Sequence, residues 1–262
     1  MTETTLVASL LHELSVELGF ELTLEREFGY AGRIQTKYGK VYYFRGTHFD
    51  INPLGASEIA TDKAYASYFM NKLGFPTPEG KSFYSDRWCK KIKSDQDTSA
   101  ALRYARTLQY PVIVKPNSKS QGQGVVKAFT DDELTDALDY IFNTIGDPVA
   151  LVQRVVQGSD YRIVVLGTEV LCAYRRTPLS VQGDGGSTIQ QLLRKKQEAF
   201  IQKGRDTTIY VGDPRTKNIL KRMGLSLKSV IAEGNAIQLL DNANLSSGGE
   251  GDDVTHILHS DY

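Results

Sequence analysis

The sequence predicts an α+β fold, in which helices are mixed with a sheet rich in antiparallel strands. Two β-type runs enclose a Gly-rich loop within 110–129, and an amphipathic helix follows them. A buried-type strand at 149–152 and a tight hairpin over 161–175 come next. Because these strands and helices do not alternate one by one, the pattern favours an α+β class over a doubly wound sheet.

Composition excludes several classes of function. The chain has 262 residues, 40% of them hydrophobic and 24% charged, which is ordinary for a globular protein. The formal net charge is zero, so neither a nucleic acid nor an anionic membrane is expected as a partner. Cys89 and Cys172 have no spacing typical of disulfides or metal sites, and they indicate reduced thiols in a cytoplasmic protein. Neither a signal peptide nor a membrane-spanning run is expected from the residue pattern.

The N-terminal stretch predicts one helix and several strands. Leucine recurs every four residues from Leu6 to Leu18, as in an amphipathic helix closed by Gly19, and we expect this stripe in the core, although it could also dock on a neighbouring copy. A half-exposed strand over 20–24 and a hairpin over 32–46, turning at Gly39, follow. Thr61 is expected to cap a helix whose apolar side is 65, 68, 69 and 73, and Lys63 falls in its first turn, where the helix dipole disfavours a cation.

A lysine at the end of a buried-type strand is the most informative feature. Val112 to Val114 lead into Lys115, and a polar loop with Gly122 and Gly124 follows. Desolvating an ammonium is expensive unless an anion meets it, and glycine-rich loops can present backbone N–H groups to phosphate. The loop is not a P-loop, because no Gly-Lys-Ser/Thr follows and no helix begins after it. A plain hairpin with an exposed lysine remains the alternative.

The remaining elements follow from capping and periodicity. A capping box at 130–133 begins a helix that Gly146 ends, and a second helix is expected to begin at Ser187 with Gln190 in the reciprocal position. Asp213 and Pro214 begin a further helix. A short strand is expected over 237–240, and 242–253 is expected to be loop.

Three features near the lysine strand point to a ligand. The strand edge at 151–156 could hydrogen-bond a purine through backbone groups, and the following hairpin carries Arg162, Arg175 and Arg176. Arg162 and Arg176 have the spacing to face one side, and guanidinium groups suit phosphates and carboxylates. Glycine-rich loops at 183–186 and 246–249 could close over a ligand. A salt-bridged sheet surface and ordinary turns are the alternatives.

In their order along the chain, these motifs resemble the ATP-grasp ligases, and they are similar to the branch that holds cyanophycin synthetase and the glutathione synthetase module of the bifunctional enzyme. The resemblance runs from about Asn52 onward. It rests on Thr61-Asp62-Lys63, Gly74-Phe75-Pro76-Thr77-Pro78, the 111–116 strand, Gln121-Gly122-Gln123-Gly124-Val125, Gly158 with Tyr161-Arg162, Gly183-Asp184-Gly185 with Thr188-Ile189, and Asn244-Leu245-Ser246-Ser247-Gly248-Gly249.

The resemblance implies ATP and Mg²⁺ as cofactors, an amino acid or peptide as substrate, and a two-step reaction. A carboxylate attacks the γ-phosphate to give an acyl phosphate, and an amine then displaces phosphate to give an amide. Positioning and charge neutralisation supply most of the catalysis in the first step. The resemblance implies that Lys63 and Lys115 contact the ATP phosphates and that a loop of Ser120, Gln121, Gly122, Gly124 and Val125 covers them. It implies an adenine hinge formed by Gln153, Arg154 and Val155 and a ribose contact by Asp160. Arg162 and Arg176 are implied to contact the transferred phosphoryl group, and the loop at 183–186 is implied to cover the acceptor.

One departure leaves the enzyme assignment open. In the family, the magnesium carboxylates lie beyond the loop that corresponds to 244–249, whereas this chain ends at Tyr262. Asp252 and Asp253 precede those positions, so no metal ligand is assigned. The chain is therefore expected to be a C-terminally incomplete ATP-grasp domain over 56–262, preceded by a helix-and-hairpin region over 1–55. Within the domain, 75–156 is expected to bind nucleotide and 157–262 to form a second subdomain. Two alternatives to the ligase are a catalytically inactive nucleotide-binding module and a protein with no ligand. Association into a homo-oligomer is a separate expectation.

Overall fold

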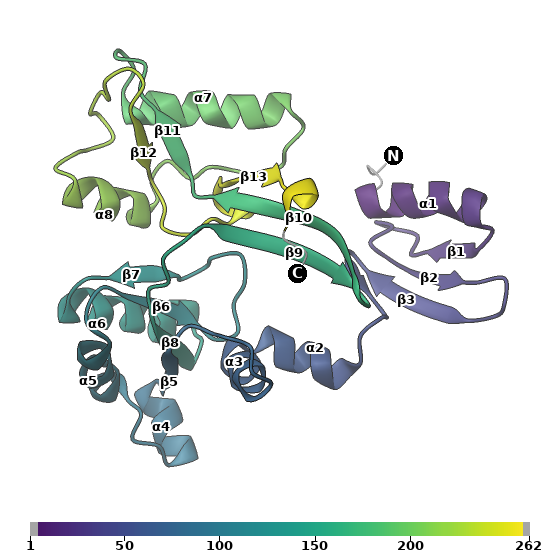
Figure 1. Ribbon diagram of the computed structural model, residues 1–262, viewed down its shortest axis with the longest axis horizontal. Coiled ribbons are helices and arrows are strands. Elements are labelled where there is room, and N and C mark those ends of the chain that lie inside the picture. The colour runs from purple at the N-terminus through teal and green to yellow at the C-terminus, as the bar shows by residue number, and fades with distance from the viewer. Residues whose placement is uncertain (1–4, 259–262) are drawn as a thin grey trace. The chain divides into compact units, whose positions relative to one another are not determined.

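The structure is a computed structural model that describes residues 5–258 (Figure 1). The chain divides into two compact units, Met1–Ala66 and Ser67–Tyr262, and each is described by itself. The subdomain limits expected from the sequence stay a prediction. Among the described residues, no helix has the length and apolar character needed to cross a membrane.

The first unit combines a helix with a four-stranded antiparallel sheet. Helix α1 (Leu6–Leu18) begins where Thr5 accepts a hydrogen bond from the N–H of Ala8, and it ends at Gly19 in the left-handed conformation, as predicted. The sheet has the order β1-β2-β3-β4, formed by Glu21–Leu24, Ala31–Gln35, Val41–Arg45 and His48–Phe49. The hairpin between β2 and β3 turns at Gly39 (φ 80°), which confirms the predicted arms.

The leucine stripe of α1 does not lie in the core, which corrects the expectation from the sequence. The exposed fractions of Leu6 and Leu18 are 74% and 61%, and the buried residues of the helix are Ala8 and Leu11. A row of every fourth residue turns by about 40° at each step of a helix with 3.6 residues per turn. The row therefore winds around the helix, whereas Ala8 and Leu11 share one narrow face.

Two helices replace the single one predicted near Lys63. Helix α2 (Leu54–Thr61) ends at Thr61, whose hydroxyl donates to the carbonyl of Glu58. Helix α3 (Lys63–Lys72) begins after Asp62, whose carboxylate accepts the N–H of Tyr65 at 2.9 Å. The predicted cap at Thr61 is therefore wrong by one residue, and Asp62 takes the role. The four apolar residues expected to be buried on this helix are exposed, namely Tyr65, Tyr68, Phe69 and Leu73.

The second unit opens with a four-stranded antiparallel sheet of order β5-β8-β6-β7. The strands are β5 (Gly80–Tyr84), β6 (Val112–Pro116), β7 (Val126–Ala128) and β8 (Val149–Arg154). Helices α5 (Thr98–Leu108) and α6 (Asp131–Asp139) pack on one face, and a hydrophobic core fills the space between them and the sheet (Figure 1). The sequence did not predict β5 or helix α4 (Asp86–Ile92).

Helix α6 begins at Thr130, but the predicted capping box is incomplete. The Thr130 hydroxyl accepts the N–H of Glu133, whereas the Glu133 carboxylate accepts the N–H of Phe129 rather than that of Thr130. The helix continues as a π-helical segment, Tyr140–Ile145, and ends at Gly146 (φ 76°), as predicted. The core side of α6 therefore reaches the turn that leads into β8.

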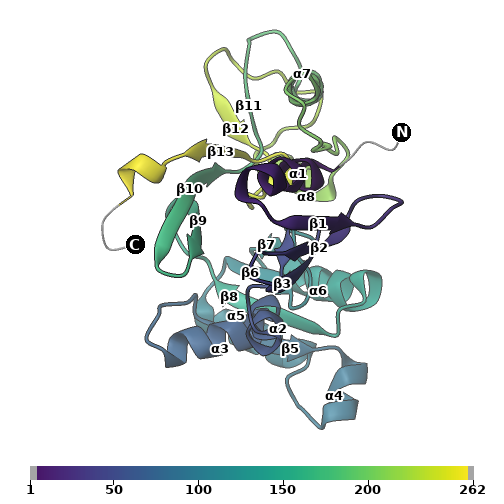
Figure 2. The same ribbon diagram turned by 90° about the vertical axis from the view of Figure 1, so that its right-hand side faces the viewer.

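The rest of the second unit contains two small sheets and two helices. Strands β9 (Asp160–Leu166), β10 (Glu169–Thr177) and β13 (Glu250–Asp253) form a sheet of order β13-β10-β9, with its strands side by side in Figure 2. Strand β11 (Ser180–Gln182) pairs with β12 (Ala236–Gln238), and helices α7 (Ile189–Gln202) and α8 (Pro214–Arg222) contribute to the same hydrophobic cluster. The expectation of loop throughout 242–253 is wrong, because 250–253 pairs with β10. The strand expected over 237–240 lies at 236–238.

Candidate functional site

Strand β6 directs Lys115 away from the helices. Val112 and Val114 are fully buried in the core beneath α5 and α6. Since side chains alternate along a strand, Ile113 and Lys115 lie on the opposite face. Lys115 is partly buried there and pairs with Leu151 of β8. The strand thus places one ammonium on the helix-free face of the sheet.

The three residues of the expected adenine hinge do not place their side chains on one face of the sheet. Gln153 is two residues from Leu151, shares the face of Lys115 and is only 4% exposed. Arg154 lies on the helix side instead, where Nε and Nη2 donate to the Glu79 carboxylate at 3.0 and 2.8 Å. Its Nη1 also donates to the carbonyl of Leu108. Val155 follows the strand and is partly buried. The structure therefore brings Gln153, but not the Arg154 side chain, to the face of Lys115.

The glycine loop between β6 and β7 has a left-handed backbone at three positions. Gln121, Gly122 and Gly124 have φ of 55°, 74° and 67°. A Cβ on Gly122 would collide with Nδ2 of Asn242 and lie 2.8 Å from Oδ1 of Asn244. Gly122 and Gly124 therefore require glycine for their left-handed backbone, and Gly122 also requires it because any side chain would collide with Asn242. Ser120 and Val125 stand at the two ends of this turn, and Ser120 is exposed.

A buried carboxylate that the sequence interpretation missed holds the start of this loop. Asp147 is 3% exposed, and its Oδ2 accepts both the N–H and the hydroxyl of Ser118 at 2.8 Å. Its Oδ1 accepts the N–H of Val149 at the start of β8. Asp147 therefore ties the end of β6 to the start of β8. The Gly-Asp-Pro run at 146–148 resembles an ordinary turn, so no local pattern indicates this role.

The β9–β10 hairpin gathers the other predicted residues on one face. Arg162 is opposite Tyr174 in the ladder, and Asp160 is opposite Arg176 two residues away, so Asp160, Arg162 and Arg176 share a face, which confirms the shared face predicted for the two arginines. Arg176 Nε donates to Asp160 Oδ1 at 2.6 Å, and the Arg176 side chain is 17% exposed. Arg175 lies on the other face and pairs with Asp252. Two residues expected to meet different parts of ATP are thus bound to each other.

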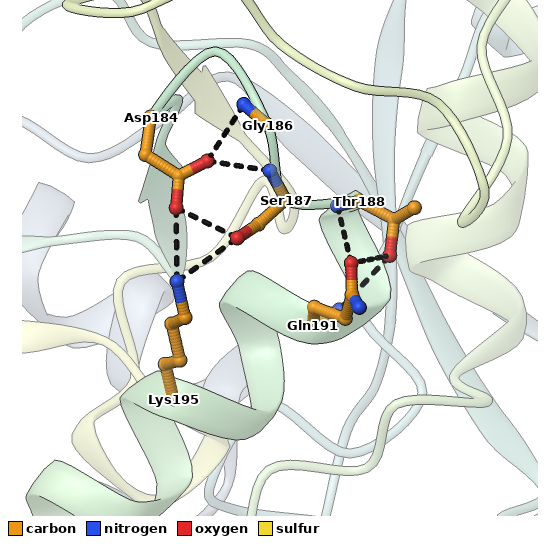
Figure 3. A network of polar contacts seen from close by, with 6 residues as sticks. All are labelled: Asp184, Gly186, Ser187, Thr188, Gln191 and Lys195. Carbon is orange, nitrogen blue, oxygen red and sulfur yellow. Dashed lines mark hydrogen bonds and ion pairs between the residues drawn. The ribbon is translucent and has the colours of Figure 1, made fainter.

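The glycine-rich loop at 183–186 is folded by one carboxylate (Figure 3). Asp184 accepts hydrogen bonds from the backbone N–H groups of Gly186 and Ser187, from the Ser187 hydroxyl at 2.7 Å and from Lys195 Nζ at 2.9 Å. Lys195 foremost, and then Ser187 and Gly186, hold the pKa of Asp184 well below its usual range. Lys195 also donates to the Ser187 hydroxyl, which itself donates to Asp184, and the lowered pKa makes this carboxylate too weak a base to take the hydroxyl proton. The arrangement orders the loop and does not activate Ser187.

Helix α7 begins one residue later than predicted. Thr188 accepts the N–H of Gln191, and the Gln191 side chain accepts the N–H of Thr188, which completes a capping box (Figure 3). The predicted pair of Ser187 and Gln190 is therefore wrong. Since the Ser187 hydroxyl is used by Asp184, the next residue takes the role of cap.

A cavity of about 500 Å³ lies beside the glycine loop, between α6 and α8. Its wall includes Tyr140 of the π-helical segment and Arg215 and Arg222 of α8. Of the predicted site residues, it reaches only Gly124 and Val125. This cavity is therefore distinct from the helix-free face that carries Lys115.

The described residues do not form a magnesium site. Over residues 5–258, no group of three or more His, Cys, Asp or Glu residues could hold a metal ion. Asp252 pairs with Arg175, and Asp253 accepts hydrogen bonds from the N–H and hydroxyl of Thr255. Lys63, the remaining predicted contact, is the first residue of α3 and belongs to the first unit, whereas the others belong to the second.

The helix-backed antiparallel sheet with its lysine and glycine loop, followed by a cation-bearing hairpin, defines the class of protein by its architecture: the chain has the ATP-grasp fold. Residues 69–184 match the family model described as the D-ala D-ala ligase C-terminus. A crystal structure of a bifunctional glutathione synthetase from Pasteurella multocida covers 98% of this chain, with a TM-score of 0.54 and 22% identity, and the match spans 34% of that chain.

Two curated relatives are similar in sequence. The glutathione biosynthesis bifunctional protein of Streptococcus agalactiae is 30% identical over 216 residues, which are 79% of this chain and 26% of the relative. Cyanophycin synthetase of Geminocystis herdmanii is 28% identical over 207 residues, 77% of this chain and 22% of the relative. The chain thus spans about a quarter of the length of these relatives.

Proposed function

We propose that the chain binds ATP on the helix-free face of the β5–β8 sheet and serves in the ligation of a carboxylate to an amine. The observation that carries the proposal is the position of Lys115, partly buried on that face at the start of a left-handed glycine loop. A partly buried ammonium favours an anion close by, and backbone N–H groups of a glycine loop favour phosphate oxygens. Gln153, nearly buried on the same face, adds a polar group that can orient the base.

In the proposed reaction, a carboxylate oxygen attacks the γ-phosphorus of ATP, and ADP leaves. An amine then attacks the acyl carbon, a C–N bond forms, and phosphate leaves with the carbonyl C–O bond broken. Arg162 and Arg176 are proposed to neutralise the charge on the transferred phosphoryl group. ATP-grasp enzymes use Mg²⁺ as well as ATP, but the described residues offer no metal cluster, so no step is assigned to a metal here.

Amino acids or peptides are the proposed substrates. The support comes from the relatives, whose names concern glutathione biosynthesis and cyanophycin synthesis. The loop at 183–186 is proposed to cover the acceptor, because Asp184 and Lys195 hold it in one defined shape. A cytoplasmic location and a homo-oligomeric state stay predictions.

A non-catalytic nucleotide-binding module is the second candidate. One observation favours it: residues 5–258 contain no cluster of metal-ligating side chains. Such a module would bind ATP through Lys115 and the glycine loop but would release no ADP in the presence of substrates.

Titration calorimetry with Mg-ATP tests the proposal, using wild type, Lys115→Ala and the control Lys81→Ala. Lys81 belongs to β5 of the same sheet, but its ammonium lies over the Tyr104 ring on the helix side. We expect wild type and Lys81→Ala to bind alike and Lys115→Ala to bind at least about tenfold more weakly, as expected for loss of a hydrogen bond to a charged group. Equal affinity of all three would contradict the site.

Release of ADP from ATP in the presence of an amino-acid mixture then separates the two candidates. Stimulated release supports the ligase. Binding without release supports the non-catalytic module.

A further inference from the structure

The first turn of α8 holds an arginine in a fixed direction. Asp213 accepts the N–H of Arg215 at 2.9 Å, and the same carboxylate accepts Nε and Nη2 of the Arg215 guanidinium, the latter at 2.7 Å. The side chains are only 29% and 14% exposed. A forked contact of this kind restricts the guanidinium to one orientation. Its remaining nitrogen, Nη1, therefore points in a defined direction.

That nitrogen reaches the glycine loop across 93 residues of sequence. Arg215 Nη1 donates to the carbonyl oxygen of Gly122 at 3.0 Å. The hydroxyl of Ser247 lies 3.5 Å from the neighbouring carbonyl of Gln121, and Asn242 packs closely against Gly122. Two consecutive carbonyl groups at the tip of the loop are thus turned toward the C-terminal part of the unit.

The direction of these carbonyls matters for anion binding. A loop that cradles phosphate must present N–H groups, because a carbonyl oxygen carries partial negative charge and repels the anion. By holding the Gly122 carbonyl, Arg215 keeps one repulsive group turned away. A guanidinium suits this task because it is always protonated and carries several donors in a fixed plane.

We propose that Arg215 is a positioning residue for the nucleotide, which acts through Gly122 and couples the glycine loop to helix α8. The proposal rests on the proposed function, because it assigns the loop to the phosphates of ATP. Arg215 contacts no reacting atom; it selects the loop conformation that can receive them.

The other end of α8 supplies a matched control. Arg222 lies 3.7 Å from the Glu133 carboxylate and 4.5 Å from the centre of the Phe129 ring, so it also joins α8 to the first part of the unit. It does not touch the glycine loop. Arg222→Gln therefore removes a comparable contact of the same helix without releasing Gly122.

Hydrogen exchange without nucleotide provides the first test. The N–H groups of Gln123 and Val125 donate to the carbonyls of Ser120 and Gly122 within the loop. In Arg215→Gln we expect these two amides to exchange about tenfold faster or more, the factor expected when a charged hydrogen bond is lost, and in Arg222→Gln to change less than about twofold. Asp213→Asn, which weakens the fork but keeps an oxygen for the helix cap, serves as the second variant if Arg215→Gln does not fold.

Affinity for Mg-ATP provides the second test. We expect Arg215→Gln to weaken binding about tenfold, Arg215→Lys to recover part of the loss, and Arg222→Gln to match wild type. Unchanged loop exchange in Arg215→Gln would overturn the coupling, whatever the affinity for ATP. Faster exchange with unchanged ATP affinity would overturn the positioning role alone. Failure of wild type to bind ATP would overturn the proposed function and with it this role, while the exchange result would still report on the contact.

Discussion

Arg176 and Asp160 face each other across the β9–β10 ladder, and Nε of the guanidinium donates to the carboxylate at 2.6 Å. Among the described residues, the two terminal nitrogens of Arg176 have no acceptor. The pair therefore fixes the base of the guanidinium and leaves its outer edge for an anion. An arginine held in this way loses little additional side-chain entropy when a phosphate or carboxylate arrives.

The first prediction compares this pair with a second one in the same sheet. Asp160→Asn should lower the free energy of unfolding by about 1 kcal/mol, because it weakens a charge-assisted hydrogen bond to a mostly buried arginine. Asp252→Asn should change it by less than about 0.5 kcal/mol, because the Arg175–Asp252 pair is exposed on both sides. Urea unfolding of the three proteins measures both values. Equal losses would show that burial of Arg176 does not strengthen its pair.

The second prediction concerns the close contact at Gly122. Gly122→Ala should lower the free energy of unfolding by about 2 kcal/mol: about 1 for the left-handed backbone and about 1 for the Asn242–Asn244 hydrogen bond that the new Cβ displaces. Gly167→Ala, at a hairpin turn with a similar φ and open space around it, should lose only about 1 kcal/mol.

Adding Asn242→Ala to wild type and to Gly122→Ala isolates the energetic effect of the collision. In the Gly122→Ala background this second change should be less damaging than in wild type, because it removes the atom that the new Cβ would strike. The interaction energy from this double-mutant cycle is the measured quantity. Strict additivity would place the loop away from Asn242 in solution.

The sequence predicts much of the core, because burial leaves a periodic signature. The apolar run Val112–Val114 correctly predicted a strand that ends near Lys115, and the register of β9 with β10 confirmed that Arg162 and Arg176 share a face. The spacing of apolar residues in α6 likewise matches its buried side, which includes Leu134 and Leu138. A local sequence pattern is therefore sufficient to predict an element where burial in the core determines the residue type.

Other elements depend on contacts distant in sequence. Strand β13 reads Glu-Gly-Asp-Asp and has no apolar alternation, and it is a strand because it pairs with the edge of β10. Arg215 gave no signal either, because its partner Gly122 lies far away in the chain and its spacing to Asp213 resembles an ordinary helix start. The roles of the predicted site residues themselves stay predictions, since geometry alone assigns no ligand.

The third prediction is a pH effect at Asp184. Its pKa is lowered in the folded state, with Lys195 as the largest cause, so its contribution to stability is present above the ordinary aspartate pKa of about 3.9 and is lost as the pH falls through the lower folded value. In an NMR titration, the carboxyl carbon of Asp184 should therefore titrate below that value. Lys195→Met should move the titration upward, and Gln191→Met, which alters only the neighbouring cap, should not. An unchanged midpoint in Lys195→Met would show that the ion pair does not persist in solution.

The last prediction separates two adjacent hydroxyl groups. Thr188→Val should lower the free energy of unfolding by about 1 kcal/mol, because it removes the acceptor for the Gln191 N–H and with it half of the capping box. Ser187→Ala should lose less than about 0.5 kcal/mol, because its hydroxyl serves an exposed network in which Asp184 keeps Lys195 and two backbone donors. Helix exchange rates at the start of α7 should follow the same order, since the cap protects its first turn. A larger loss for Ser187→Ala would show that Ser187 is the helix cap, as the sequence pattern alone predicts. The loop at 183–186 would then have a conformation different from the one described here.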